Sequence, residues 1–220
     1  MSDPYARPVD WDALTFHALN EELDVDQRWS TWGSVERSAR GPKPWPDWLV
    51  TSAAALDTDL GVLKTGKEAD VVLVERAVPD DPRQACLLAA KRYRDTDHRL
   101  FHRDAAYTEG RRIRNSRDGR AMSGKTAHGR AVAAGLWARS EWTALNRLFA
   151  AGVPVPYPVQ LDGSEILMEF VGDGDAAAPR LQQVRPAPAQ LTELFDQLLA
   201  ALRTMTGLGI VHGDLSPFNT

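Results

Sequence analysis

The alternation of apolar and polar residues predicts several short β-strands in the 220-residue chain. After a Trp- and Pro-rich start, brief apolar runs rich in Val and Leu are separated by polar turns, which is typical of strands. The runs lie at 62–64, 71–75, 86–91, 153–160 and 166–171. Because the turns between the first three are short, we expect those three strands to form a meander.

Two segments show helical spacing instead. Apolar residues recur at helical intervals between Ala131 and Ala151, and Gly152 stands where a helix would end. A second helix is predicted before Gly207, which is its expected stop. Its apolar stripe consists of Leu191, Leu194, Phe195, Leu198, Leu199, Leu202 and Met205.

Two other segments lack a regular pattern. Residues 1–59 combine scattered tryptophans with proline and glycine, and short helices are predicted near 11–23 and 28–39. These tryptophans are too scattered to build a core of their own, so the segment is expected to pack as an arm on the following domain. Residues 95–130 are rich in Arg and Gly and too charged for a core element, which predicts a flexible basic insert.

The order of the predicted elements is that of a protein-kinase-like α+β fold. Three strands, a helix and two strands, at 60–172, match a complete amino-terminal lobe made of a mostly antiparallel sheet and one helix. Residues 173–220 supply a linker, a long helix and a loop, which match the start of a carboxy-terminal lobe. Residues 1–59 form the Trp-rich helical arm that precedes both.

Composition narrows the class of protein. The apolar fraction of 43% is ample for a core, and the formal net charge of -4 argues against binding nucleic acid through bulk charge. The single cysteine, Cys86, lies in an apolar run and is expected to be buried and inert. The start of the chain shows no leader pattern and no apolar run is long enough to span a membrane, so a cytoplasmic protein is expected.

The final residues, His212 to Thr220, resemble the catalytic loop of kinases. Phosphoryl transfer needs a carboxylate that orients the attacking hydroxyl and ligands for the metal that neutralises the phosphates. Asp214 is the candidate for the first role and Asn219 for the second. Gly213 replaces the arginine that most protein kinases carry before this aspartate, which argues against switching through a phosphorylated activation loop.

Lys91 ends an apolar run, so its ammonium is expected to emerge from a buried strand. A nucleotide-binding lysine needs such a place, with a carboxylate from the neighbouring helix to hold it. Glu141 is the candidate for that carboxylate. For either residue alone, a solvated surface position is the simpler interpretation; together with the terminal loop, the pair favours nucleotide binding.

The turn after Lys64 is a candidate phosphate loop. Gly66 lets a backbone approach a ligand closely, and Thr65, Lys67 and nearby amides are able to hold phosphate oxygens. The turn lacks the three glycines of the usual kinase loop, and a solvated hairpin is its alternative interpretation.

The basic insert has two interpretations that the sequence leaves open. A strip of this kind engages RNA in some proteins and is only solvated surface in others. The cations of the segment from Arg92 to Arg130 include Arg94, Arg99, Arg103, Arg111, Arg112, Arg114, Arg117, Arg120, Lys125 and Arg130.

Taken together, these motifs resemble the RIO-type atypical protein kinases, especially the first RIO subfamily. The resemblance covers about residues 60 to 220, and its motifs are Lys64–Val71, Ala89–Lys91, the insert before Glu141, Met168–Gly172, Ala178–Leu181 and His212–Asn219.

The resemblance implies a serine/threonine kinase or ATPase that uses ATP and Mg²⁺, with Asn219 as a metal ligand. Several members of the family act in maturation of the small ribosomal subunit, so a ribosomal particle or its RNA is an implied partner of the insert, beside a protein substrate. Autophosphorylation is also implied, with Thr108, Ser116 and Ser123 as candidate acceptors. Beyond Lys91, Thr65, Gly66 and Lys67, the implied cofactor-binding residues are Glu68, Val71, Met168, Glu169, Val171 and Pro179.

In this family a metal-binding aspartate follows the catalytic loop, and the sequence ends before such a residue. We therefore expect this chain alone to bind nucleotide weakly and not to turn it over. Two other interpretations stay open. One is a small-molecule phosphotransferase of the aminoglycoside or choline kinase kind, which also carries His-Gly-Asp with a following Asn; the other is a noncatalytic scaffold with the same fold.

Overall fold

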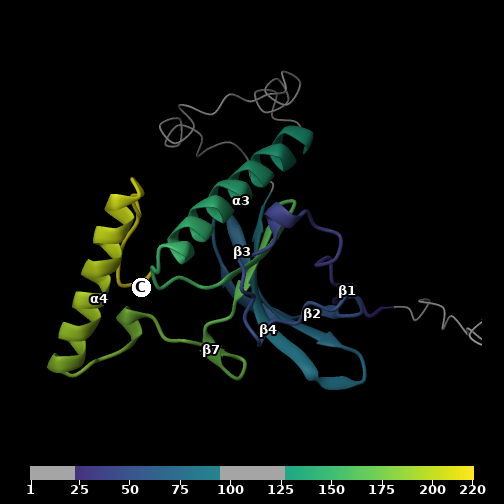
Figure 1. Cartoon of the computed structure of the whole chain (residues 1–220), viewed down its shortest axis with the longest axis horizontal. Helices are drawn as coiled ribbons and strands as arrows, with labels where there is room; N and C mark the ends of the chain where they lie inside the picture. Colours follow the sequence, from purple (N-terminus) through teal and green to yellow (C-terminus); the bar gives the residue numbers. More distant parts are fainter. Residues whose placement is uncertain (1–22, 95–126) are drawn as a thin grey trace, which may run out of the picture.

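The computed structural model describes residues 23–94 and 127–220. An antiparallel sheet forms its centre, with one long helix across the sheet and a second helix set apart from it (Figure 1). The six strands lie in the order β1 (Gln27–Trp29), β2 (Leu56–Thr65), β3 (Ala69–Val78), β4 (Asp81–Tyr93), β6 (Glu165–Glu169) and β5 (Pro158–Asp162). The predicted α+β class, the meander and the additional strand pair are confirmed.

Side chains of the sheet alternate between two faces. One face, which includes Val72, Val74, Leu88 and Ala90, is buried beneath the segment that precedes β2. The other face contacts helix α3 (Ala127–Ala150), in line with the helix predicted there. The predicted stop is confirmed, because α3 ends just before Gly152, which has a φ of 74°.

The arm belongs to the core of this lobe. Trp32, Leu49 and Val50 are buried against the sheet, and β1 pairs with the start of β2. The helix predicted at 28–39 is wrong, since this stretch holds β1 and one short 3-10 turn, Arg37–Ala39. Pairing with β2 and burial of Trp32 outweigh the weak helical preference of the stretch.

Two boundaries also need correction. Strand β2 begins at Leu56, before the boundary expected at residue 60, and β1 of the arm belongs to the same sheet, so arm and lobe are not separate units. The insert was expected to reach residue 130, but α3 already begins at Ala127. The rest of the insert and nearly all of the helix expected at 11–23 lie outside the described residues.

A buried charged cluster connects the arm with the sheet. The Arg76 guanidinium donates to Asp57 Oδ1 at 2.6 Å and to Oδ2 at 2.9 Å, and both side chains are fully buried. The guanidinium also donates to Gln160 Oε1 at 3.1 Å. Gln160 Nε2 in turn donates to Thr31 Oγ1 at 2.8 Å. The cluster therefore joins β2, β3, β5 and the arm.

The residues after β6 lead to the second helix. A short hairpin of β7 (Gly172–Asp173) and β8 (Ala176–Ala177) and a 3-10 turn (Leu181–Gln183) precede α4 (Pro188–Gly207). The predicted end at Gly207 is confirmed, since Gly207 is the last residue of α4 and Leu208 is its C-cap; the positive φ of 67° falls two residues later, at Gly209.

The stripe of α4 is largely uncovered, with only Met205 buried. Within the described parts of the chain, neither α3 nor α4 is long and apolar enough to cross a membrane.

Candidate functional site

Lys91 and Glu141 form an ion pair between strand β4 and helix α3. Lys91 Nζ donates to Glu141 Oε1 at 2.7 Å and to Oε2 at 2.6 Å, with about 30% of each side chain exposed (28% and 32%). The Tyr93 hydroxyl also donates to Glu141, and Lys91 Nζ lies 5.2 Å from the centre of the Tyr93 ring. The predicted partnership of Lys91 with Glu141 is thus present, and the carboxylate has a second donor.

Helical spacing explains the position of Glu141. Ala138 and Trp142 are buried against Leu161 and Ile166 of the sheet, and Trp142 Nε1 donates to the Ser38 carbonyl at 3.2 Å. Glu141 lies three residues after Ala138 and next to Trp142, on the border of this buried stripe. Packing of the stripe therefore fixes the carboxylate beside the strand that carries Lys91.

The register of the sheet collects other predicted residues on the face of Lys91. Val71 of β3 lies opposite Lys91, and Met168 of β6 lies opposite Ala89. Paired residues of neighbouring strands point to the same face, and so do residues two apart in one strand. Val71, Lys91 and Met168 therefore share one face, the face that contacts α3.

The predicted phosphate loop is the tight turn between β2 and β3. Its backbone is closed by a hydrogen bond from Gly66 N to Ala69 O at 2.9 Å. A Cβ on Gly66 would lie 3.0 Å from the same carbonyl, so the turn has little room for a side chain. Thr65, Lys67 and Glu68 are exposed around it, which leaves them accessible to a ligand.

The segment after β6 is the predicted hinge. Backbone and side chain of Glu169 fix its start: Glu169 N donates to Tyr157 O, and Tyr157 N donates to Glu169 Oε2, both at 2.9 Å. The Val171 carbonyl accepts from Ala178 N at 2.9 Å, while the Val171 N–H has no acceptor among the described residues. An unpaired N–H of this kind is available to a ligand. Pro179, which follows Ala178, is exposed.

Asp214 and Asn219 lie together in the terminal loop. Asn219 Nδ2 donates to Asp214 Oδ2 at 3.0 Å and to the Asp214 carbonyl at 2.6 Å. The φ of 74° at Gly213 explains why glycine stands at this position, since other residues rarely adopt that conformation. Because the amide nitrogen of Asn219 is occupied, its oxygen and the Asp214 carboxylate remain as hard donors of the kind that Mg²⁺ prefers.

Comparison with known proteins identifies the family. The sequence pattern of the RIO domain matches residues 88–220, which is more than half of the chain. The chain belongs to the RIO domain family.

Curated relatives agree with this RIO assignment. The chain is 30% identical over 164 residues to "RIO-type serine/threonine-protein kinase Rio1" of Haloferax volcanii, which covers 74% of this chain and 50% of the relative. It is 32% identical over 165 residues to "Serine/threonine-protein kinase rio1" of Schizosaccharomyces pombe, with 72% of this chain and 30% of the relative covered. It is 26% identical over 220 residues to human "Serine/threonine-protein kinase RIO3", with 95% of this chain and 40% of the relative covered. The chain thus spans half the length, or less, of these relatives.

The structure brings the four predicted catalytic residues of this RIO domain together as two pairs. Lys91 contacts Glu141, and Asp214 contacts Asn219. Within 23–94 and 127–220, no hydrogen bond or ion pair connects one pair with the other. A common centre formed by both pairs stays a prediction.

Sequence reasoning missed Tyr93, the second donor to Glu141. The signal was available, because Tyr93 lies two residues after Lys91 in the same strand and so on the same face. It also missed two partly buried ion pairs of Arg92, a residue of the central strand β4: Arg92 donates to Asp59 at 2.5 Å and 2.7 Å and to Glu165 at 2.6 Å. No local pattern links Asp59 to Glu165, since the contact depends on strand order.

Proposed function

We propose that this RIO domain binds ATP with Mg²⁺ and provides the catalytic loop of a serine/threonine kinase. The observation that carries the proposal is the Lys91–Glu141 pair, in which a helix carboxylate holds a strand lysine on the face that includes Val71 and Met168. That arrangement suits a lysine that binds the α- and β-phosphates of a nucleotide. The three relatives named above are all serine/threonine-protein kinases, which supports the same activity.

The other groups have roles that follow from their chemistry. The exposed turn at Gly66 covers the phosphates with its amides, and the free N–H of Val171 binds the adenine edge. Asp214 orients the acceptor hydroxyl, and the amide oxygen of Asn219 binds the metal, which neutralises charge on the transferred phosphoryl group. The acceptor is a serine or threonine hydroxyl of a partner protein or of the chain itself.

Nucleotide binding is the first test. A fluorescent ATP analogue with Mg²⁺ is titrated into the wild-type protein, Lys91→Met and Lys43→Met, where Lys43 is an exposed lysine of the arm. We expect Lys91→Met to weaken binding at least about tenfold, since it removes a direct charge on the phosphates, and Lys43→Met to bind like wild type. Equal affinity of all three proteins would contradict a nucleotide site at Lys91.

Phosphoryl transfer is tested separately, on protein purified from the organism that produces it. With labelled ATP and Mg²⁺, Asp214→Asn is expected to lower transfer to serine or threonine by about 100-fold or more, the range typical of general acid–base groups. Label that appears on small amino alcohols in place of protein hydroxyls would support the small-molecule phosphotransferase. Nucleotide binding without any transfer would support the scaffold.

Contact with ribosomal RNA through the basic insert is proposed from the sequence alone, because nearly all of the insert lies outside the described residues. A mobility shift of labelled ribosomal RNA that weakens as salt rises would support it. Absence of binding at low salt would contradict it.

A further inference from the structure

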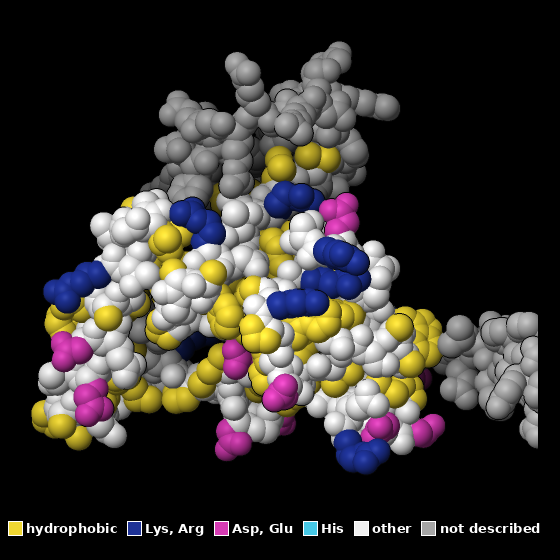
Figure 2. Space-filling model, viewed as in Figure 1, with side chains coloured by type: hydrophobic (Ala, Val, Ile, Leu, Met, Phe, Trp, Pro, Cys, Tyr) yellow, Lys and Arg dark blue, Asp and Glu magenta, His cyan; other side chains and the backbone are white. Residues whose placement is uncertain are grey.

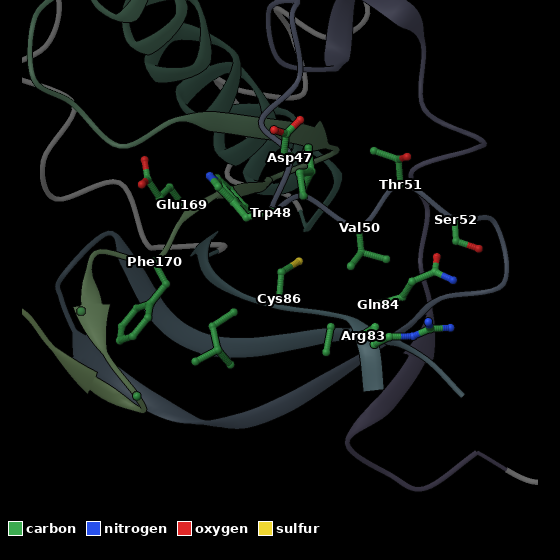
Figure 3. Close-up of a pocket in the computed structure, with 15 residues that line it drawn as sticks. Asp47, Trp48, Val50, Thr51, Ser52, Arg83, Gln84, Cys86, Glu169 and Phe170 are labelled. Atoms are coloured by element: carbon green, nitrogen blue, oxygen red, sulfur yellow. The ribbon is translucent and has the colours of Figure 1, made fainter. Parts of the chain in front are cut away.

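A cavity of about 690 Å³ opens between the arm, strand β4 and the segment after β6 (Figure 3). Its walls are residues 47–52 of the arm, 83–87 of β4, and four residues of the hinge and the β7–β8 hairpin between 169 and 174. The volume is in the range of sites that bind ligands. None of the residues assigned to phosphate, metal or hydroxyl binding lines it.

The free edge of β4 forms one wall of this cavity. Five consecutive residues, 83–87, line it, so the strand presents its backbone edge and not only one face. On that side β6 pairs with Leu88 to Arg92 and no further. Among the described residues, no other strand or backbone group bonds to Gln84 through Leu87 on this edge. An unpaired strand edge is a template for pairing with another chain.

The charge inside the cavity is negative and uncompensated. The Arg83 cation is already paired with Asp81 at 3.3 Å. Asp47 and Glu169 have no cationic partner in the described parts of the chain. Figure 3 shows these two carboxyl groups at the same end of the cavity as Trp48, a residue that is 38% exposed.

Acidic side chains also gather around the neighbouring β7–β8 hairpin, as Figure 2 shows. Two carboxylates next to an aromatic face form an environment that attracts an ammonium or guanidinium group. The cavity therefore combines a backbone template with a preference for cations.

We propose that this cavity is a docking site for an extended segment of a partner protein that carries a lysine or arginine. The segment adds to the sheet as a strand beside residues 84–87, and its cation lies between Asp47 and Glu169 over Trp48. Strand addition supplies main-chain hydrogen bonds, and the pocket for the cation supplies specificity. The site lies beside the predicted hinge, with which it shares Glu169, and does not depend on kinase activity.

The probe is a short peptide of alternating threonine and valine with one central lysine, titrated calorimetrically. We expect the lysine peptide to bind, and a peptide with glutamate in place of the lysine to bind at least about tenfold more weakly, since it meets two like charges. Asp47→Asn should weaken binding of the lysine peptide about threefold to fivefold, in line with a partly exposed charge pair. The matched control Asp24→Asn, an exposed carboxylate outside the cavity, should leave the affinity unchanged.

Backbone pairing is tested with two N-methylated forms of the peptide, one methylated at odd amides and the other at even amides. Only alternate amides of an edge strand point to its neighbour, so one form should lose binding and the other should keep it. Equal binding of the two forms would overturn strand addition, and absence of binding by the lysine peptide would overturn the site.

Two further outcomes would each assign the cavity to another occupant and overturn the proposal. One is spermidine binding as tightly as the peptide, which indicates a pocket for small cations. The other is self-association of the protein, measured by sedimentation, that disappears when the peptide is added. This result would indicate that a second copy of the chain occupies the cavity.

Discussion

The two carboxylate oxygens of Glu141 both lie within 2.7 Å of Lys91 Nζ, although the residues are 50 positions apart in the chain. The contact joins strand β4 to helix α3 on the face of the sheet that includes Val71 and Met168. An ion pair of this exposure contributes little to stability, at most about 1 kcal/mol. Its geometry therefore points to a functional role more than to a structural one.

Glu141→Gln should weaken nucleotide binding less than Lys91→Met does. The lysine charge remains in this variant but loses the carboxylate that positions it, so we expect a decrease of about threefold to tenfold in affinity, equivalent to roughly 0.7–1.4 kcal/mol. Glu193→Gln, at an exposed position of α4, is the matched control. Fluorescence titration measures the affinity and urea denaturation the stability, which should change by less than about 1 kcal/mol. A loss of folding in Glu141→Gln would show that the pair is structural.

Replacing Asp57 by Leu should destabilise the protein by about 3–5 kcal/mol, because the buried Arg76 cation then has no counter-charge. One guanidinium nitrogen of Arg76, Nη1, already has no hydrogen-bond partner among the described residues. The double variant Asp57→Leu/Arg76→Met should be more stable than the single variant, since neither charge remains.

Urea denaturation measures these differences. Arg83→Met is the control, because its pair with Asp81 is exposed and should contribute less than about 1 kcal/mol. If the double variant is destabilised by the sum of the effects of Asp57→Leu alone and Arg76→Met alone, the two side chains act independently.

Gly41→Ala should loosen the arm from the sheet. A Cβ at this position would lie 1.9 Å from Pro158 O and 2.6 Å from the Tyr157 hydroxyl, and Gly41 N donates to Val159 O at 2.8 Å. We expect a loss of about 1–3 kcal/mol in the free energy of unfolding, as for overpacked cores. Gly33→Ala is the matched control: its nearest neighbour would be 4.0 Å away, and a change within about 0.5 kcal/mol is expected. Equal denaturation midpoints for the two variants would contradict tight docking of the arm.

Acid should weaken the fold partly through Asp59. Hydrogen bonds from the Arg92 guanidinium lower the pKa of the Asp59 carboxyl below its ordinary value of 3.8. Because the folded state holds the proton less tightly than the unfolded state, this contribution is complete above pH 3.8 and is lost as the pH falls through the folded pKa.

Asp59→Asn should therefore flatten the dependence of the denaturation midpoint on pH in that acid range. Midpoints measured in urea from neutral pH down to pH about 2.5 test this expectation. Asp24→Asn is the control and should retain the wild-type slope. A slope in Asp59→Asn equal to that of wild type would rule out the contribution.

Local patterns in the sequence were sufficient for the elements of the lobe and for the candidate chemistry. Apolar runs marked the strands of the meander, and helical spacing with a following glycine marked α3 up to Gly152. Lys91 is a candidate because it ends an apolar run and accompanies the terminal loop, and Asp214 because His-Gly-Asp with a following Asn is a compact motif. Such signals depend on neighbours along the chain, which the sequence shows directly.

The arm and the buried ion cluster were decided by tertiary structure. Residues 28–39 have a helical pattern of their own, yet pairing of β1 with β2 and burial of Trp32 give them another conformation. No local pattern singles out Asp57 and Arg76, and only the register of β2 with β3 places them opposite each other in a buried position. The free edge of β4 depends in the same way on where β6 stops pairing. Burial and strand order involve residues far apart in the chain, so they emerge only when the sheet has formed.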